Sequence, residues 1–220
     1  MSRFGLACVL VLGSLAVTPA VRASDDWHLW QETVWPLFTR GRVSGTLVEQ
    51  TRYRDDMREI FFVYWEGSAA VQVLPHLRAG AVYSYMQEKG QDGHWRDEHR
   101  PMFDLIPHVA VGPVKFENRA RLEIRVIEGA SDDVKWRYRN RIQAVYTLPG
   151  TDGRLAVCAS EEPFFETPHG GWNQNRLFAG LQTSLTKQLS ATLAWGIQSI
   201  RRGADWDDRQ LLLLSGKIRL

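Results

Sequence analysis

Apolar and polar side chains alternate with a period of two through most of this chain, and residues 114–126 are the clearest case. Leu122 and Ile124 lie on an apolar face, while Arg121 and Glu123 lie on the opposite, charged face. Because successive side chains of a β-strand point to opposite sides, this alternation predicts strands with one polar and one apolar face. No segment after residue 24 keeps the 3.6-residue period of an amphipathic helix, so the pattern predicts an all-β fold.

Ten strands follow from this pattern, and one further candidate precedes them. The ten are expected near residues 42–53, 60–73, 77–87, 98–111, 114–127, 135–148, 154–165, 173–186, 189–200 and 209–220. The eleventh candidate, 27–36, would break the even count that brings both ends of an up-and-down barrel to one side. We expect it either to line the lumen or to be joined by a further strand.

The connections between the predicted strands alternate in length. Short turns, such as 112–113 and 187–188, are followed by longer polar loops, such as 88–97 and 201–208. Short turns at one end and longer loops at the other are typical of outer-membrane barrels. The sequence therefore predicts an antiparallel, transmembrane, up-and-down β-barrel of 10 to 12 strands.

Four tryptophans fall in or beside the longer predicted loops. They are Trp95, Trp136, Trp172 and Trp206. Outer-membrane barrels carry girdles of aromatic residues where the membrane meets water, and these four residues are expected to form part of one. The alternative is that they are ordinary core tryptophans, because large aromatics also fill soluble cores.

Residues 1–23 differ from the rest of the chain. Arg3 precedes an apolar run over residues 6–17, and Ala23 closes a short motif of small residues. This predicts a secretory signal peptide that is cleaved after Ala23, leaving one barrel domain over 24–220. The apolar run falls short of the roughly 20 residues that a membrane helix needs, which argues against an anchor.

Charge and cysteine content exclude several classes of function. The whole chain has a formal net charge of +2, and cleavage would remove Arg3 and Arg22 and no acid, leaving a neutral chain. We therefore expect no nucleic-acid partner. The mature chain would keep only Cys158, so no intramolecular disulfide and no cysteine metal cluster is expected. No cofactor and no metal site is predicted.

Alternation by itself does not say which face of the barrel lies inside. A soluble lipocalin-like barrel would place its leucines and tryptophans in the interior. A membrane barrel does the reverse, because an arginine that faces lipid at mid-bilayer costs about 2–4 kcal/mol. If the barrel spans a membrane, its arginines must face the lumen.

The charged faces then predict a cluster of residues in the lumen. Its members are Glu98, Arg100, Asp104, Glu117, Arg119, Arg121, Glu123, Arg125, Arg137, Arg139, Arg141, Glu162 and Arg176. One interpretation is a packed interior held by ion pairs, because buried charges tend to be paired. The other is an anion-selecting pore, or a pocket for an acidic ligand, that uses the surplus arginines as donors.

Several sequence strings resemble a family of bacterial outer-membrane barrel proteins that is known only as a domain of unknown function. They are EHRP at 98–101 with Asp104 and Leu105, NRARLEIR at 118–125, WRYRNR at 136–141 and WNQNRLFAGL at 172–181. The resemblance covers roughly residues 27–220. It implies a barrel in the outer membrane of a Gram-negative bacterium and implies no known activity. The chain departs from outer-membrane proteins in ending on Leu220 rather than an aromatic residue.

A structural or passive, porin-like transport role is therefore predicted, with no catalytic residues. Its expected partners are outer-membrane lipid, the barrel-assembly machinery and a small anionic solute. One alternative is a lipid-modifying hydrolase, which would need a serine beside a histidine. Its candidates, none in a recognisable motif, are Ser84, Ser160, Ser199, His99 and His169. The other alternative is a soluble periplasmic lipocalin-like binding barrel.

Overall fold

The computed structural model describes residues 23–129, 134–167 and 171–218, which form eleven strands. They are β1 (Ala23–Arg40), β2 (Val43–Arg54), β3 (Glu59–Leu74), β4 (Leu77–Lys89), β5 (Trp95–Val111), β6 (Val114–Ile127), β7 (Val134–Thr147), β8 (Leu155–Glu166), β9 (Gly171–Ser184), β10 (Leu189–Arg202) and β11 (Asp205–Ile218). Within these residues no helix is long and apolar enough to cross a membrane. The predicted signal peptide lies almost wholly outside the described residues and stays a prediction.

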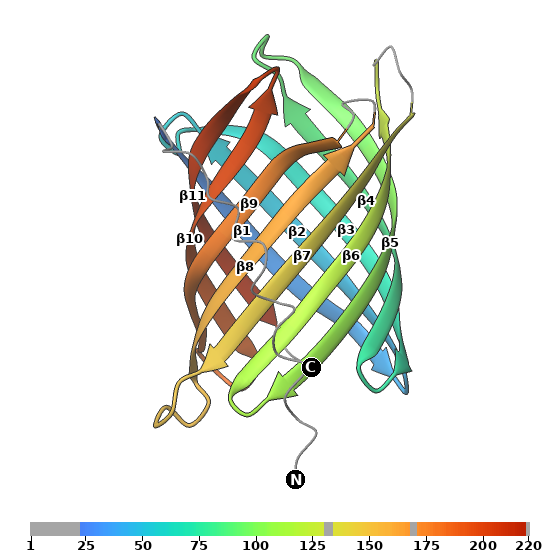
Figure 1. The fold of residues 1–220 in the computed structure, drawn as a ribbon, viewed down its shortest axis with the longest axis vertical. Helices are drawn as coiled ribbons and strands as arrows, with labels where there is room; N and C mark the ends of the chain where they lie inside the picture. The colour runs from blue at the N-terminus through green and yellow to red at the C-terminus, as the bar shows by residue number, and fades with distance from the viewer. Residues whose placement is uncertain (1–22, 130–133, 168–170, 219–220) are drawn as a thin grey trace.

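The strands close into one barrel in which each strand pairs with its neighbour in the sequence (Figure 1). Ten of these pairings are antiparallel, whereas β1 and β11 pair in parallel, with Trp30 opposite Leu213. An odd number of alternating strands forces this, because the first and last strands then run in the same direction. The predicted all-β barrel of 10 to 12 strands is confirmed, although its closing pair is not antiparallel.

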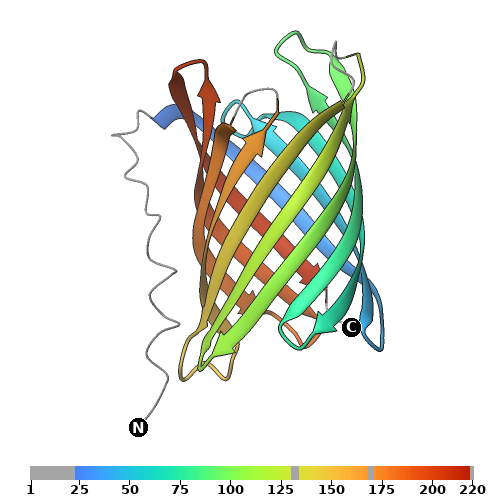
Figure 2. The ribbon, with the colours of Figure 1, turned by 45° about the vertical axis from the view of Figure 1, so that its right-hand side comes forward.

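Residues 27–36 form part of the barrel wall. They belong to β1, which pairs with β2 on one side and β11 on the other. The expectation that they line the lumen, or are matched by a twelfth strand, is wrong. As a result the start of β1 and the end of β11 lie at opposite ends of the barrel (Figure 2).

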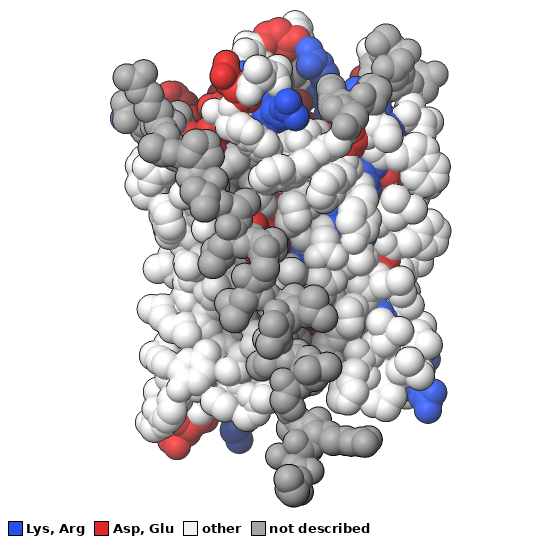
Figure 3. All heavy atoms as spheres, viewed as in Figure 1, with Lys and Arg blue, Asp and Glu red and all other residues white. Residues whose placement is uncertain are grey.

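The charged faces of the strands point into the barrel. Arg121 and Glu123 are 2% and 0% exposed, whereas Leu122 between them is 40% exposed. On β10, too, the large apolar residue faces outward: Ala194 is buried, whereas Trp195 is 43% exposed. Figure 3 accordingly shows an outer wall made largely of uncharged residues, with Lys, Arg, Asp and Glu gathered mainly at its two ends.

Polar residues interrupt this outer wall at a few places. Asn118 on β6 and Asn140 on β7 donate amide hydrogen bonds to each other at 2.7 and 3.2 Å. Asn175 on β9 donates to Glu161 on β8 at 3.2 Å. Asn118 and Asn140 therefore satisfy each other across strands, which lowers the cost of placing them on an otherwise apolar surface.

Connection lengths alternate less regularly than the sequence predicts. The connection 148–154 lies at the end that also holds the short turns 75–76 and 112–113. At the opposite end, the expected long loop 201–208 shrinks to residues 203–204, because Arg202 pairs with Asp205 and continues the ladder. Gly203 has φ +66°, a left-handed conformation that glycine adopts at no steric cost in such a tight turn.

The four predicted girdle tryptophans all lie toward the end of the barrel that holds the β10–β11 turn. Trp95, Trp136 and Trp172 are 43%, 47% and 39% exposed, and Trp206 is half-buried. The rings of Trp172 and Trp206 contact each other, with centroids 4.9 Å apart. Residues from β5, β7, β9 and β11 thus form an aromatic band at one end.

Candidate functional site

An ion-pair network fills one side of the lumen. Arg121 on β6 reaches Glu66 on β3 at 2.6 Å and Asp104 on β5 at 2.6 and 2.7 Å. All three side chains are almost fully buried, with 2%, 11% and 5% of their surfaces exposed. Tyr64 donates a further hydrogen bond to Glu66. Because the guanidinium bridges two carboxylates from different strands, it ties β3, β5 and β6 together across the interior.

A second part of the network lies nearer the β10–β11 end. Glu98 accepts hydrogen bonds from Arg100 at 2.5 and 2.8 Å and from Arg125 at 2.6 and 2.9 Å. Arg125 also pairs with Glu166 on β8. Arg100 and Arg125 thus share the Glu98 carboxylate. The second partner of Arg125, Glu166, lies two strands away from it, on β8.

The third part of the network is short of negative charge. Glu162 on β8 pairs with Arg119 at 2.8 Å, Arg139 at 3.0 Å and, more loosely, Arg176 at 3.9 Å. Glu123 likewise serves both Arg137 and Arg139, at 2.5 and 3.0 Å. One carboxylate shared among several guanidiniums leaves a local excess of positive charge.

Aromatic rings and arginines also stack across the lumen. The guanidinium carbon of Arg52 lies 4.0 Å from the centroid of the Phe62 ring and 3.8 Å from that of Trp30. Arg176 lies 4.9 Å from the Trp30 centroid and 4.6 Å from that of Phe164. Strands β2, β3, β1, β9 and β8 supply these residues in turn, so the stack joins opposite walls of the barrel. Cation–π attraction stabilises each contact in such a desolvated setting.

Glycine makes room for this packing. Phe178 on β9 lies opposite Gly196 on β10, and a side chain at Gly196 would collide with the Phe178 ring. The Phe178 ring in turn packs against Trp30, with centroids 5.7 Å apart. Gly196 therefore positions Phe178, and through it Trp30, inside the barrel.

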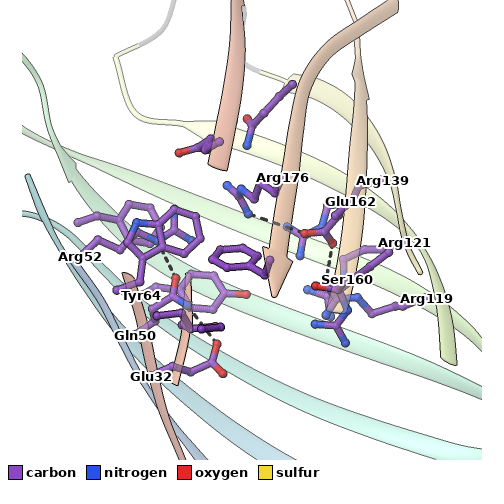
Figure 4. Close-up of a pocket in the computed structure, with 18 of the residues that line it drawn as sticks. Glu32, Gln50, Arg52, Tyr64, Arg119, Arg121, Arg139, Ser160, Glu162 and Arg176 are labelled. Carbon is purple, nitrogen blue, oxygen red and sulfur yellow. Dashed lines mark hydrogen bonds and ion pairs between the residues drawn. The ribbon is translucent and has the colours of Figure 1, made fainter. Parts of the chain in front are cut away.

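A cavity of about 1050 Å³ occupies the rest of the lumen. It extends from Gly203 in the β10–β11 turn to Lys217 near the other end of β11. Figure 4 shows Glu32, Gln50 and Arg52 on one side of it, with Arg176 and Glu162 on the other. The lumen is thus neither fully packed nor empty, since buried Met86 and Met102 fill the β4–β5 side.

The cavity wall is strongly cationic. Among the described residues, thirteen arginines and lysines line it, against five glutamates. Arg52 has no ion pair with any described residue; its Nε donates to Gln50 Oε1 at 2.6 Å, and Gln50 donates to Glu32 at 3.0 Å. The buried N–H groups of Trp30 Nε1 and Arg119 Nε have no hydrogen-bond partner among the described residues. These N–H groups can donate hydrogen bonds to an anionic ligand.

The structure brings most of the predicted lumen cluster together. Its members lie on β5 to β9 and face the interior, with Glu117 and Arg141 toward the β5–β6 turn, 3.5 Å apart. The sequence missed the contribution of β1 to β3, namely Trp30, Arg52 and Glu66. No signal for them existed in the alternation, because polar residues fall on both faces of β2.

Among the described residues, the hydrolase candidates do not form a serine–histidine dyad. Ser84 and Ser160 face the lumen, whereas His99 lies on the outer face, where its Nδ1 is 2.6 Å from the Tyr83 hydroxyl. Ser199 has no histidine among its described hydrogen-bond partners, and His169 lies outside the described residues. Within the described part of the chain, no group of three or more His, Cys, Asp or Glu side chains could hold a metal ion.

Comparisons with known proteins add a family match. A family model described as a protein of unknown function (DUF2490) matches residues 22–209. No curated protein matches the chain. A solved chain from a study of the in-meso crystallisation of membrane proteins is 11% identical, with a TM-score of 0.40, over 83% of this chain and 72% of that one. A likeness this low carries no argument here.

Proposed function

Since this chain belongs to the family of proteins of unknown function DUF2490, we propose that it is an outer-membrane β-barrel with a passive transport role, whose lumen admits small anions. The proposal includes export by a cleaved signal peptide, insertion by the barrel-assembly machinery and an outer wall in contact with lipid. It follows from the barrel geometry and the lumen chemistry.

The length of the strands and the apolar outer wall of the barrel support the membrane location. Its strands are 12 to 18 residues long, and roughly 9–11 residues suffice to span a bilayer. Large apolar side chains such as Phe103 and Leu105 are more than half exposed on the outer wall. A soluble barrel would leave this surface in water, and monomeric soluble proteins rarely expose apolar patches so large.

The observation that carries the transport role is the excess of positive charge along the cavity. Some carboxylates that do not themselves line the cavity, such as Glu98, Asp104 and Glu123, form ion pairs with arginines that do. Even with these partners added, arginines and lysines remain in excess. Rings of such cations select anions in channels.

The two alternatives receive less support. A lipocalin-like barrel binds apolar ligands inside an apolar lumen, and here the apolar face points outward. A lipid-modifying hydrolase needs a nucleophile beside a base, and the serine candidates form no hydrogen bond with any histidine that the structure describes.

Planar-bilayer recording tests the proposal. The purified barrel should conduct, and its reversal potential in a potassium chloride gradient should show preference for chloride over potassium. Arg176→Gln should reduce that preference, because Arg176 lines the cavity and is weakly paired. Arg154→Gln, at an exposed turn residue outside the cavity, should leave it unchanged. Absence of conductance, or cation preference, would refute the transport role.

Cell fractionation tests the proposed outer-membrane location. The protein should be recovered with outer membranes and should migrate differently on gels before and after boiling, as folded barrels do. Recovery in the soluble periplasmic fraction would overturn the membrane location and leave a soluble barrel.

A further inference from the structure

Arg52 carries a half-buried positive charge in the lumen that forms no ion pair with a described carboxylate. Its guanidinium carbon lies over the rings of Trp30 and Phe62, 3.8 and 4.0 Å from their centroids, and its Nε donates to Gln50. Gln50 is itself oriented by Glu32, whose carboxylate accepts from the Gln50 amide at 3.0 Å. The side chain is therefore fixed in place, while its terminal N–H groups have no hydrogen-bond partner among the described residues. A fixed donor of this kind suits a bound anion.

Arg176 approaches the same ring from the opposite wall. Its closest carboxylate, Glu162, is 3.9 Å away and already pairs with Arg119 and Arg139 at shorter distances. Because Arg52 and Arg176 both lie within 5 Å of the Trp30 centroid, at 3.8 and 4.9 Å, they bring two under-neutralised charges to one place. Two like charges this close favour a ligand of opposite sign between or beside them.

Trp30 adds an unused donor at the same point. The residue is 3% exposed and lines the cavity, and its Nε1 has no hydrogen-bond partner among the described residues. A buried N–H group without a partner is costly, so an acceptor supplied by a ligand would stabilise it. The three residues together offer charge and hydrogen bonds but no acceptor of their own.

We propose that Arg52, Trp30 and Arg176 form a binding site for a compact oxyanion of the phosphate class, inside the anion-admitting lumen proposed above. Compactness follows from the stacking. Two aromatic rings already lie over each guanidinium, so a planar aromatic anion could stack there only by displacing one of them. The terminal N–H groups of Arg52 and the Nη1 group of Arg176 remain, since the Gln174 amide oxygen accepts from Nε and Nη2 of Arg176 at 2.9 and 3.0 Å. These remaining groups match the oxygens of a tetrahedral anion. The cavity is large enough to hold such an ion with its water.

Equilibrium dialysis with radiolabelled inorganic phosphate, at low salt and with the folded barrel in detergent, tests the site. Wild-type protein should bind phosphate saturably. Arg52→Gln should weaken binding roughly tenfold or more, because it removes a charged donor. Trp30→Phe keeps an aromatic ring for stacking and removes the N–H group together with the five-membered part of the indole, and should weaken binding by a few-fold. Arg154→Gln, which removes an exposed charge elsewhere, should bind like wild type.

The outcomes separate this site from the transport role. Unchanged affinity in Arg52→Gln and Trp30→Phe, or no saturable phosphate binding by the folded wild type, would overturn the site. Heat-modifiable migration of each variant shows that it is folded, so a loss of binding can be assigned to the site. Phosphate binding without conductance would uphold the site and refute the transport role. Anion-preferring conductance without phosphate binding would do the reverse.

Discussion

Arg121 offers the sharpest test of whether the buried ion pairs of the lumen stabilise the barrel. Replacing it by leucine would leave Glu66 and Asp104 buried without their cation. Removal of one partner from a buried ion pair costs about 3–5 kcal/mol, because the remaining charge stays desolvated. Arg121 is 2% exposed and contacts two carboxylates at 2.6–2.7 Å, so we expect a loss at the upper end of that range.

Arg78 provides a matched control. It pairs with Glu117 at 2.6 Å, as closely as Arg121 does with its partners, but the two side chains are 36% and 31% exposed. Exposed pairs contribute about 0–1 kcal/mol. Arg78→Leu should therefore cost little, although it removes the same charge from the same barrel.

Urea unfolding of the barrel, followed by tryptophan fluorescence in lipid vesicles, measures both losses. A further variant replaces Arg121, Glu66 and Asp104 together by leucine. It should recover most of the stability lost in Arg121→Leu, because apolar groups of similar size often replace a buried ion cluster at little cost. If Arg121→Leu is no less stable than Arg78→Leu, the buried network does not hold the barrel as argued.

Three further predictions concern the wall and the cavity. Replacing Asn118 and Asn140 together by leucine should leave the barrel folded and at least as stable in lipid vesicles; a large loss by urea unfolding would argue against lipid contact there. Gly196→Val should lower stability by about 1–3 kcal/mol by the same assay, because it displaces the Phe178 ring. Cys158, which lines the cavity, should react faster with anionic than with cationic thiosulfonate reagents; equal rates would contradict a cationic lumen.

The wall of this barrel was largely predictable from local pattern. The strands β6, β7 and β10 have one charged or small face and one apolar face, so the alternation along each of them identifies both the strand and its two surfaces. The predicted ranges 114–127 and 189–200 agree closely with the observed strands. The family resemblance stated from four sequence strings is confirmed by the match over residues 22–209.

The candidate site was only half predictable. On β2, Glu49 and Thr51 alternate with Gln50 and Arg52, so both faces are polar and the sequence does not indicate which one turns inward. Arg52 consequently escaped the predicted cluster. On β3 the residues before Glu66 are mainly apolar on both faces, so the alternation does not indicate that Glu66 turns inward. Its importance depends on its contact with Arg121, three strands away.

The sequence by itself determined that the chain forms strands with a charged face, because side-chain alternation is a local property of each strand. Tertiary structure alone decided which face lies inside, that eleven strands close through a parallel β1–β11 pair, and that arginines and aromatic rings meet across the lumen. These features depend on contacts between residues far apart in the chain, such as Trp30 with Arg176. The alternation of side chains along a strand does not predict such contacts, because they arise only when the sheet closes on itself.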